Sequence, residues 1–174
     1  TDEAVSARPE QHWAVSAYTM TSALGRGVAA HAQTLRDGRS GLAWQRFETV
    51  QLQAWLGLVD GVDEVALPPA LQAFDCRNNR LAWLGLQADG FAARVQQAVQ
   101  RHGAHRVGVF MGTSTSGILQ TEQAYRYRDL QTGALPAGLH YGETHNTSSL
   151  WGFVQAALCL RGPVWSVSTA SSSG

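Results

Sequence analysis

The hydroxyl side chains near the end of the sequence have the residue type and setting that best suit covalent chemistry. Ser171 to Ser173 follow a short apolar run, Val164 to Thr169, and are followed by Gly174. At a sharp turn between a strand and a helix, a nucleophile is exposed, and the free N–H groups of the helix favour a developing anion. The small neighbours leave room for an acyl group to approach. This segment therefore predicts a site for acyl transfer.

A second segment of glycines and hydroxyl residues, Gly112 to Gly117, follows another apolar run, Arg106 to Met111. It has neither the lysine of a P-loop nor the G-x-G-x-x-G spacing of a dinucleotide fold, so nucleotide binding is not expected. The segment Ser171 to Gly174 is not the G-x-S-x-G elbow of α/β-hydrolases, and no triad partner is identifiable. A serine hydrolase therefore stays only as an alternative.

Metal and disulfide chemistry have little support in the sequence. His140 and His145 lie close together, but no further ligand accompanies them, so they do not predict a metal site. The two cysteines, Cys76 and Cys159, have no C-x-x-C spacing, which argues against a zinc site or a disulfide framework. We expect a reducing, cytoplasmic location.

Length and composition indicate one globular domain with a hydrophobic core. The 174 residues are 44% hydrophobic and 15% charged. There are 13 basic and 13 acidic residues, so no net charge favours nucleic acid or an anionic membrane. No apolar run approaches the roughly 20 residues that span a bilayer, and Thr1 to Glu10 lacks the pattern of an export signal. We therefore expect no membrane span, and partners that recognise the protein locally.

The elements that must position the hydroxyl segments are strands alternating with helices. The apolar run before each hydroxyl segment predicts a buried strand, and Arg106 to Met111 is apolar enough to be covered on both faces. A further buried strand is predicted at the start of the chain. The three predicted strands are Trp13 to Tyr18, Arg106 to Met111 and Val164 to Thr169.

Four segments place apolar residues at helical spacing. The longest is interrupted near Asp89-Gly90, and Asp75 is its predicted N-cap. Residues 42–72 are expected to be irregular with room for an edge strand, and residues 130–142 to form a loop. The alternation predicts a layered α/β domain with a largely parallel sheet. The predicted helices are Gly27 to Leu35, Asn79 to His102, Thr121 to Tyr127 and Ser148 to Leu160.

The hydroxyl segments also carry a resemblance to a known family. Residues 160–163 (LRGP) followed by residues 168–174 (STASSSG) resemble the active-site signature of β-ketoacyl-[acyl carrier protein] synthases, which reads LRGP, a strand, then T-A-C-S-S-G. Ser171 stands at the position of the nucleophilic cysteine. The resemblance covers nearly the whole chain, and residues 121–137 further resemble the branch linked to aryl polyene type pigments. The other matching stretches are residues 20–25 (MTSALG), 35–42 (LRDGRSGL) and 106–118 (RVGVFMGTSTSGI).

The resemblance implies a thiolase-like layered α-β-α-β-α fold, of which residues 1–174 are the N-terminal half. The C-terminal half is absent, so a large apolar face is expected to be uncovered. Family members form dimers through the strand before the nucleophile and the preceding helix, here Ser148 to Thr169. A homodimer, or a heterodimer of a ketosynthase with a chain-length factor, is therefore implied.

The resemblance also implies a reaction. The family's cysteine accepts an acyl chain from the phosphopantetheine of acyl carrier protein, and malonyl-acyl carrier protein is then decarboxylated to a carbanion that attacks the thioester. No resident cofactor is implied. The two assisting histidines lie in the missing half, so none of the six histidines here receives that role. By resemblance, Ser171 marks the nucleophile and an oxyanion N–H, and Thr115, Gly117 and Ile118 line the acyl pocket.

Serine at position 171 changes the chemistry. A cysteine at a helix N-terminus holds some thiolate near neutral pH, whereas an alkoxide needs a positioned general base. Three explanations stay open: an engineered substitution, a naturally inactive partner subunit, or a modified cysteine missing from the sequence, which would make Ser171 the residue after the nucleophile. We predict a condensing enzyme of fatty acid, polyene or polyketide biosynthesis, inactive as it stands, with a non-catalytic subunit resembling a chain-length factor as the alternative.

Overall fold

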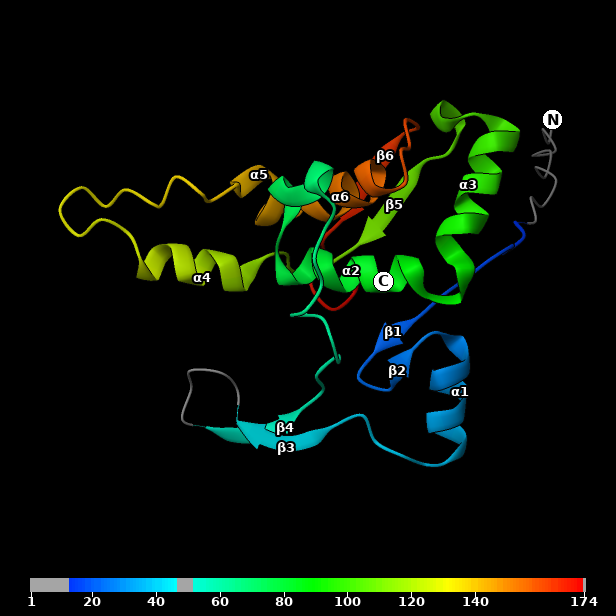
Figure 1. The fold of residues 1–174 in the computed structure, drawn as a ribbon, viewed down its shortest axis with the longest axis horizontal. Helices are drawn as coiled ribbons and strands as arrows, with labels where there is room; N and C mark the ends of the chain where they lie inside the picture. Colours follow the sequence, from blue (N-terminus) through cyan, green and yellow to red (C-terminus); the bar gives the residue numbers. More distant parts are fainter. Residues whose placement is uncertain (1–12, 47–51, 174) are drawn as a thin grey trace, which may run out of the picture.

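The structure, a computed structural model, describes residues 13–46 and 52–173. Figure 1 shows two groups of elements: a smaller N-terminal group of short strands beside one helix, and a larger group in which helices pack on a parallel strand pair. The prediction for Thr1 to Glu10 lies outside the described residues, as does Gly174. No helix in the described ranges has the length and apolar character to cross a membrane.

The N-terminal group consists of two small antiparallel hairpins and helix α1. The helix ends at Arg36, and Asp37 with Gly38 forms the predicted turn, in which Gly38 has a left-handed φ of 64°. The second hairpin lies where an irregular segment with an edge strand was predicted, and Trp44 pairs across it with Trp55. The elements of this group are β1 (Thr21–Ser22), β2 (Gly25–Arg26), α1 (Val28–Arg36), β3 (Ala43–Arg46) and β4 (Gln53–Leu56).

The strand predicted for Trp13 to Tyr18 is wrong. The segment belongs to no strand, and its large side chains are exposed, with Trp13 at 85% and Tyr18 at 63%. A strand exists only when a neighbour supplies partners for its backbone N–H and C=O groups. No described strand pairs with this segment, so its apolar pattern alone does not place it in a sheet.

Helix α1 receives its N-terminal cap from a distant residue. Its N-cap, Gly27, has no side chain to offer, and the Asp89 carboxylate instead accepts hydrogen bonds from the Val28 N–H at 3.1 and 3.0 Å. The same carboxylate accepts the Thr19 hydroxyl at 2.8 Å. Asp89 lies in the break between two helices of the larger group. This acidic side chain therefore satisfies one orphan donor of α1 and ties the two groups together.

The hydrophobic core lies in the larger group, around Phe153. This ring is fully buried and meets Phe74 and Trp83 edge-on, with centroids 6.1 and 6.4 Å apart. The long predicted helix is two helices, broken at the predicted position. Helix α4 begins three residues before its predicted start. The elements of this group are η1 (Pro69–Phe74), α2 (Arg77–Gln87), η2 (Ala88–Gly90), α3 (Phe91–His102), η3 (Ala104–Arg106), β5 (Val109–Gly112), α4 (Ile118–Arg126), α5 (Tyr141–Thr144), α6 (Ser149–Ala157) and β6 (Val164–Val167).

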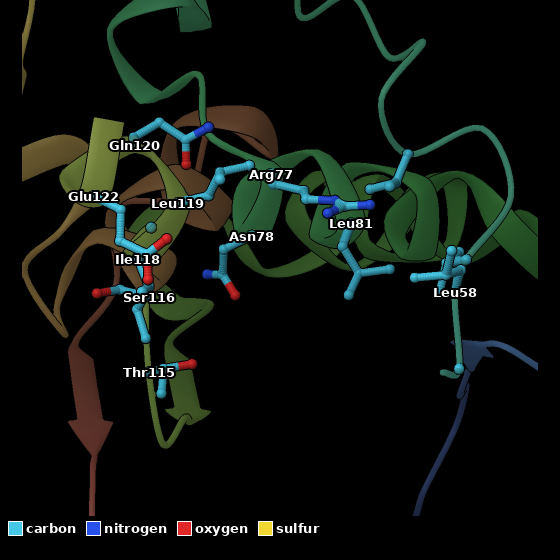
Figure 2. A pocket seen from close by; sticks show the side chains of 14 residues that line it. Leu58, Arg77, Asn78, Leu81, Thr115, Ser116, Ile118, Leu119, Gln120 and Glu122 are labelled. Atoms are coloured by element: carbon cyan, nitrogen blue, oxygen red, sulfur yellow. The ribbon is translucent and has the colours of Figure 1, made fainter. Parts of the chain in front are cut away.

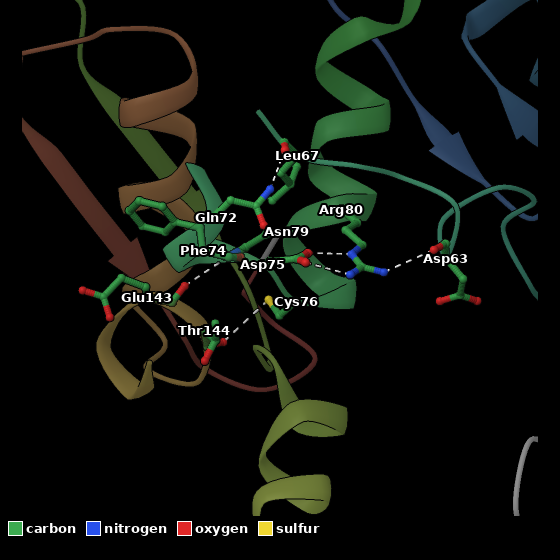
Figure 3. Close-up of polar contacts among 10 residues, drawn as sticks. All are labelled: Asp63, Leu67, Gln72, Phe74, Asp75, Cys76, Asn79, Arg80, Glu143 and Thr144. Atoms are coloured by element: carbon green, nitrogen blue, oxygen red, sulfur yellow. Dashed lines mark hydrogen bonds and ion pairs between the residues drawn. The ribbon is translucent and has the colours of Figure 1, made fainter. Parts of the chain in front are cut away.

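The predicted cap Asp75 does not cap α2. The N-cap of this helix is Cys76, which makes no side-chain capping bond. The Asp75 carboxylate instead accepts two hydrogen bonds from the Arg80 guanidinium, at 2.6 and 2.7 Å, as Figure 3 shows. That bond raises the pKa of Arg80, since it favours the charged form. Asp75 therefore fastens the first turn of α2 from outside, by an ion pair.

Strands β5 and β6 form the parallel pair, with Phe110 opposite Trp165. One face buries Val109 in the core, but the other leaves Phe110 71% and Trp165 49% exposed. The prediction that these strands are buried, with the first covered on both faces, is therefore wrong for this chain. The exposed aromatic face is the kind of uncovered apolar surface that the resemblance implied.

Candidate functional site

The two hydroxyl segments begin at the same edge of the parallel strand pair. Gly112 lies opposite Val167 at the carboxyl ends of β5 and β6, and the Thr113 N–H donates to the Val167 carbonyl at 3.0 Å. Residues 112–117 and the serine turn, residues 168–173, therefore leave the sheet side by side. Two segments more than 50 residues apart in sequence are brought together by this register.

The serine turn is held by bonds among its own residues. The Ser173 hydroxyl accepts the Thr169 N–H at 2.9 Å and donates to the Ala170 carbonyl at 2.7 Å, while the Ser172 hydroxyl donates to the Thr169 carbonyl at 2.9 Å. Ala170 has a left-handed φ of 54°. Ser171 is exposed, and within residues 13–46 and 52–173 its hydroxyl makes no hydrogen bond. The neighbours fix the turn and leave this side chain open to a reactant.

No base activates Ser171 in the described part of the chain. The hydrogen-bonded histidine rings there are His31, which meets Ser22, and His145, which meets Thr121. No cluster of three or more metal-ligating side chains occurs among the described residues. A serine hydroxyl without a base is a poor nucleophile. The Ser171 hydroxyl is therefore accessible but has no activating base among the described residues.

Residues 112–117 end in a buried segment that packs against α5. The Gly117 N–H donates to the Thr144 carbonyl at 2.8 Å, and the Ser116 hydroxyl donates to the His145 carbonyl. Gly117 allows this approach because a Cβ here would lie 2.5 Å from the Thr144 carbonyl oxygen and 3.2 Å from Cys76 Cβ. Burial raises the pKa of the Cys76 thiol, which lies behind the segment. The glycine is thus required by close packing.

A cavity of about 420 Å³ lies beside this segment. The predicted residues Thr115, Gly117 and Ile118 line one wall, which α4 continues. Figure 2 shows Thr115 and Ile118 on this wall. Ser171 does not line the cavity, so the structure brings three of the four predicted site residues together. The opposite wall comes from the connection after β4 and from α2, through Leu58, Val59, Val62, Asn78 and Leu81.

The opposite wall was missed by sequence reasoning. Leu56 to Val59 is a short apolar run inside a stretch interpreted as irregular surface structure. This apolar run was the only sequence feature that pointed to the opposite wall, but it does not identify the segment that it lies against. Arg77 and Glu122 place charges on the lining, and Asn78, Thr115, Ser116 and Gln120 add neutral polar groups beside the apolar side chains.

The fold is the thiolase-like α/β fold of ketosynthases. The chain is similar to a solved structure of a ketosynthase (ApeO) in complex with its chain length factor (ApeC) from Xenorhabdus doucetiae, with a TM-score of 0.67 and 27% sequence identity. The similarity covers 89% of this chain and 39% of that chain, so this chain spans well under half of its length. It confirms the resemblance and the fold class predicted from the motifs. No protein-family model and no curated protein matches the sequence.

Proposed function

We propose that the chain is part of a condensing enzyme that extends a carrier-bound acyl group by decarboxylative condensation. The observation that supports this most is the exposed Ser171 on a locked turn, where β6 ends beside the start of residues 112–117. In this proposal position 171 is the nucleophile site and its N–H is one oxyanion donor. Thr115, Gly117 and Ile118 contact the acyl chain.

The proposed chemistry needs a thiol at position 171. Its sulfur attacks the thioester carbon of an acyl group on acyl carrier protein, and the phosphopantetheine thiol leaves with the proton. Malonyl-acyl carrier protein then loses carbon dioxide, and the resulting carbanion attacks the enzyme-bound thioester and releases the thiol. Serine cannot start this sequence without a base. The narrower assignment is an aryl polyene type pathway, because residues 121–137 resemble that branch.

The test is acylation of a Ser171→Cys variant of the intact protein. Incubation with an acyl carrier protein thioester should add one acyl group by intact mass, and a Ser171→Ala variant should add none. Peptide mass analysis of residues 164–173 should first establish whether a cysteine stands between Ala170 and Ser171. If the introduced thiol reacts with iodoacetamide but never accepts an acyl group, the proposed activity is wrong.

A second function is supported by the serine itself. The solved neighbour pairs a ketosynthase with a chain length factor, and a subunit without a nucleophile fits the second role. In that case α6 and β6, within residues 148–169, form the dimer surface. The protein should then copurify with an active ketosynthase and alter the length of its products, with or without Ser171→Ala. A protein that stays unpaired beside an active ketosynthase would exclude this function.

A further inference from the structure

One histidine holds the wall of the cavity at two points. The main-chain carbonyl of His145 accepts the Ser116 hydroxyl, at the start of the wall. Its ring Nδ1 lies 2.6 Å from the Thr121 hydroxyl, in the first turn of α4. The wall between these two contacts consists of residues 116–121, and residues 116–120 line the cavity. His145 therefore fixes the spacing between residues 112–117 and helix α4.

The Thr121 hydroxyl extends this contact to the wall's backbone. It also lies 3.2 Å from the Gly117 carbonyl, and a hydroxyl has one proton to donate. We assign that proton to the Gly117 carbonyl, so that His145 Nδ1–H donates to Thr121 and Thr121 donates to Gly117. The chain of donors ends at the residue whose missing Cβ permits the close packing on Thr144.

The histidine ring is itself held in place. Tyr141 lies against it with ring centroids 5.1 Å apart, and the Thr144 hydroxyl donates to the His140 carbonyl at 2.7 Å to close the turn of α5. The Asn79 amide donates to the Glu143 carbonyl at 3.2 Å, as Figure 3 shows, which joins α5 to α2. Because α2 contributes to the opposite wall, both walls of the cavity are held by hydrogen bonds to α5 or to its C-cap residue, His145.

We infer that His145 is a positioning residue that selects the length of the acyl chain held in the cavity. This inference rests on the proposed function. Loss of the Nδ1 contact frees the first turn of α4 to move relative to the loop, and Ile118 and Leu119 move with it. The cavity then changes in width beside Ile118 and Leu119, so that discrimination between chain lengths falls while binding of the thioester end persists.

The experiment measures binding of hexanoyl-, decanoyl- and tetradecanoyl-pantetheine to the intact protein by calorimetry. His145→Ala should change the ratio of affinities for the best and worst chain by about threefold to tenfold, the effect of one hydrogen bond. His145→Asn, whose amide nitrogen can take the place of Nδ1, should restore most of the ratio. The matched control is His140→Ala, because that exposed ring makes no hydrogen bond in the described part of the chain.

A second variant guards against simple misfolding. Thr121→Val keeps the shape of the side chain and removes the hydroxyl, so it should shift the ratio in the same direction. Combined with His145→Ala it should add little, because the two groups act through one contact. Normal binding with an unchanged ratio in both variants would overturn the inference. Absence of binding to every probe by the unsubstituted protein would count against the proposed function instead.

Discussion

The two hydroxyl segments leave the same sheet edge but are stabilised in opposite ways. Residues 112–117 end in Ser116 and Gly117, which are buried and bonded to residues 144–145 of another element. Residues 168–173 are largely exposed, and their side-chain hydrogen bonds stay within the turn. The cavity wall therefore depends on tertiary packing, whereas the serine turn depends on local geometry.

Under the proposed function, this difference separates the segment that recognises the ligand from the segment that reacts with it. A wall that selects ligands by shape must be rigid, and contacts to other elements supply that rigidity. A reacting side chain must instead remain accessible while its backbone is fixed. Substitutions in the two segments should therefore differ in size and kind, and the comparison can be tested in the intact protein.

The largest expected contrast is in thiol reactivity. In the Ser171→Cys variant, iodoacetamide should modify the introduced thiol at least about 100-fold faster than Cys76, because Cys76 is fully buried and its raised pKa lowers its thiolate fraction. The exposed Cys159 serves as the internal reference. Labelling followed by peptide mass analysis measures all three rates. Equal rates for Cys76 and the introduced thiol would remove the distinction between the segments.

Adding a methyl group to the packed segment should be the most destabilising change. Gly117→Ala places a Cβ against the Thr144 carbonyl oxygen, so we expect a loss of roughly 1–3 kcal/mol in the free energy of unfolding, measured in urea. Gly138→Ala is the matched control, because a Cβ there meets nothing within 4 Å. Similar costs for both variants would show that the packing at Gly117 is loose.

A pair of serines compares the two segments directly. Ser116→Ala removes the buried hydroxyl that donates to the His145 carbonyl, and should cost about 1–2 kcal/mol. Ser172→Ala removes an exposed bond of the turn and should stay within about 0.5 kcal/mol. Urea unfolding of both variants decides the point. A larger cost at Ser172 than at Ser116 would contradict the assignment of tertiary and local stabilisation.

Sequence reasoning predicted those elements whose cause is local. Helices α1, α2, α3 and α6 follow from apolar spacing, and the break at Asp89-Gly90 follows from turn chemistry. The serine turn and residues 115–118 were selected as candidates because contiguous residues there resemble ketosynthase motifs. These are the features for which a window of sequence contains the physical cause.

The failures depend on a partner that lies outside the sequence pattern that was interpreted. Asp89 was interpreted as a helix break, yet its carboxylate caps a helix 61 residues away. Asp75 has the residue type of a cap, but the nearby Arg80 guanidinium competes for its carboxylate. Trp13 to Tyr18 has a strand pattern without a partner, and the contact of His145 with Thr121 has no sequence signal. In each case the partner decides the outcome, and a single sequence does not identify the partner.

The smallest expected effect tests whether the serine turn stores strain. Ala170 holds a left-handed φ of 54°, which disfavours any residue with a Cβ. Ala170→Gly should therefore stabilise the protein by about 0.5–1 kcal/mol, although glycine gains entropy in the unfolded chain. Ala156→Gly, in the exposed part of α6, should have the opposite sign, with a cost of about 1 kcal/mol.

The effect of Ala170→Gly on the reactivity of a thiol at position 171 shows whether the strain at Ala170 contributes to the reaction. With glycine at position 170 the turn can adopt other conformations, so the thiol of a Ser171→Cys protein should meet an acyl thioester in the productive orientation less often. We expect slower acylation together with unchanged or faster alkylation by iodoacetamide, which needs access but no orientation. If Ala170→Gly destabilises the protein as Ala156→Gly does, the turn is unstrained, and its rigidity comes from the Ser172 and Ser173 bonds alone.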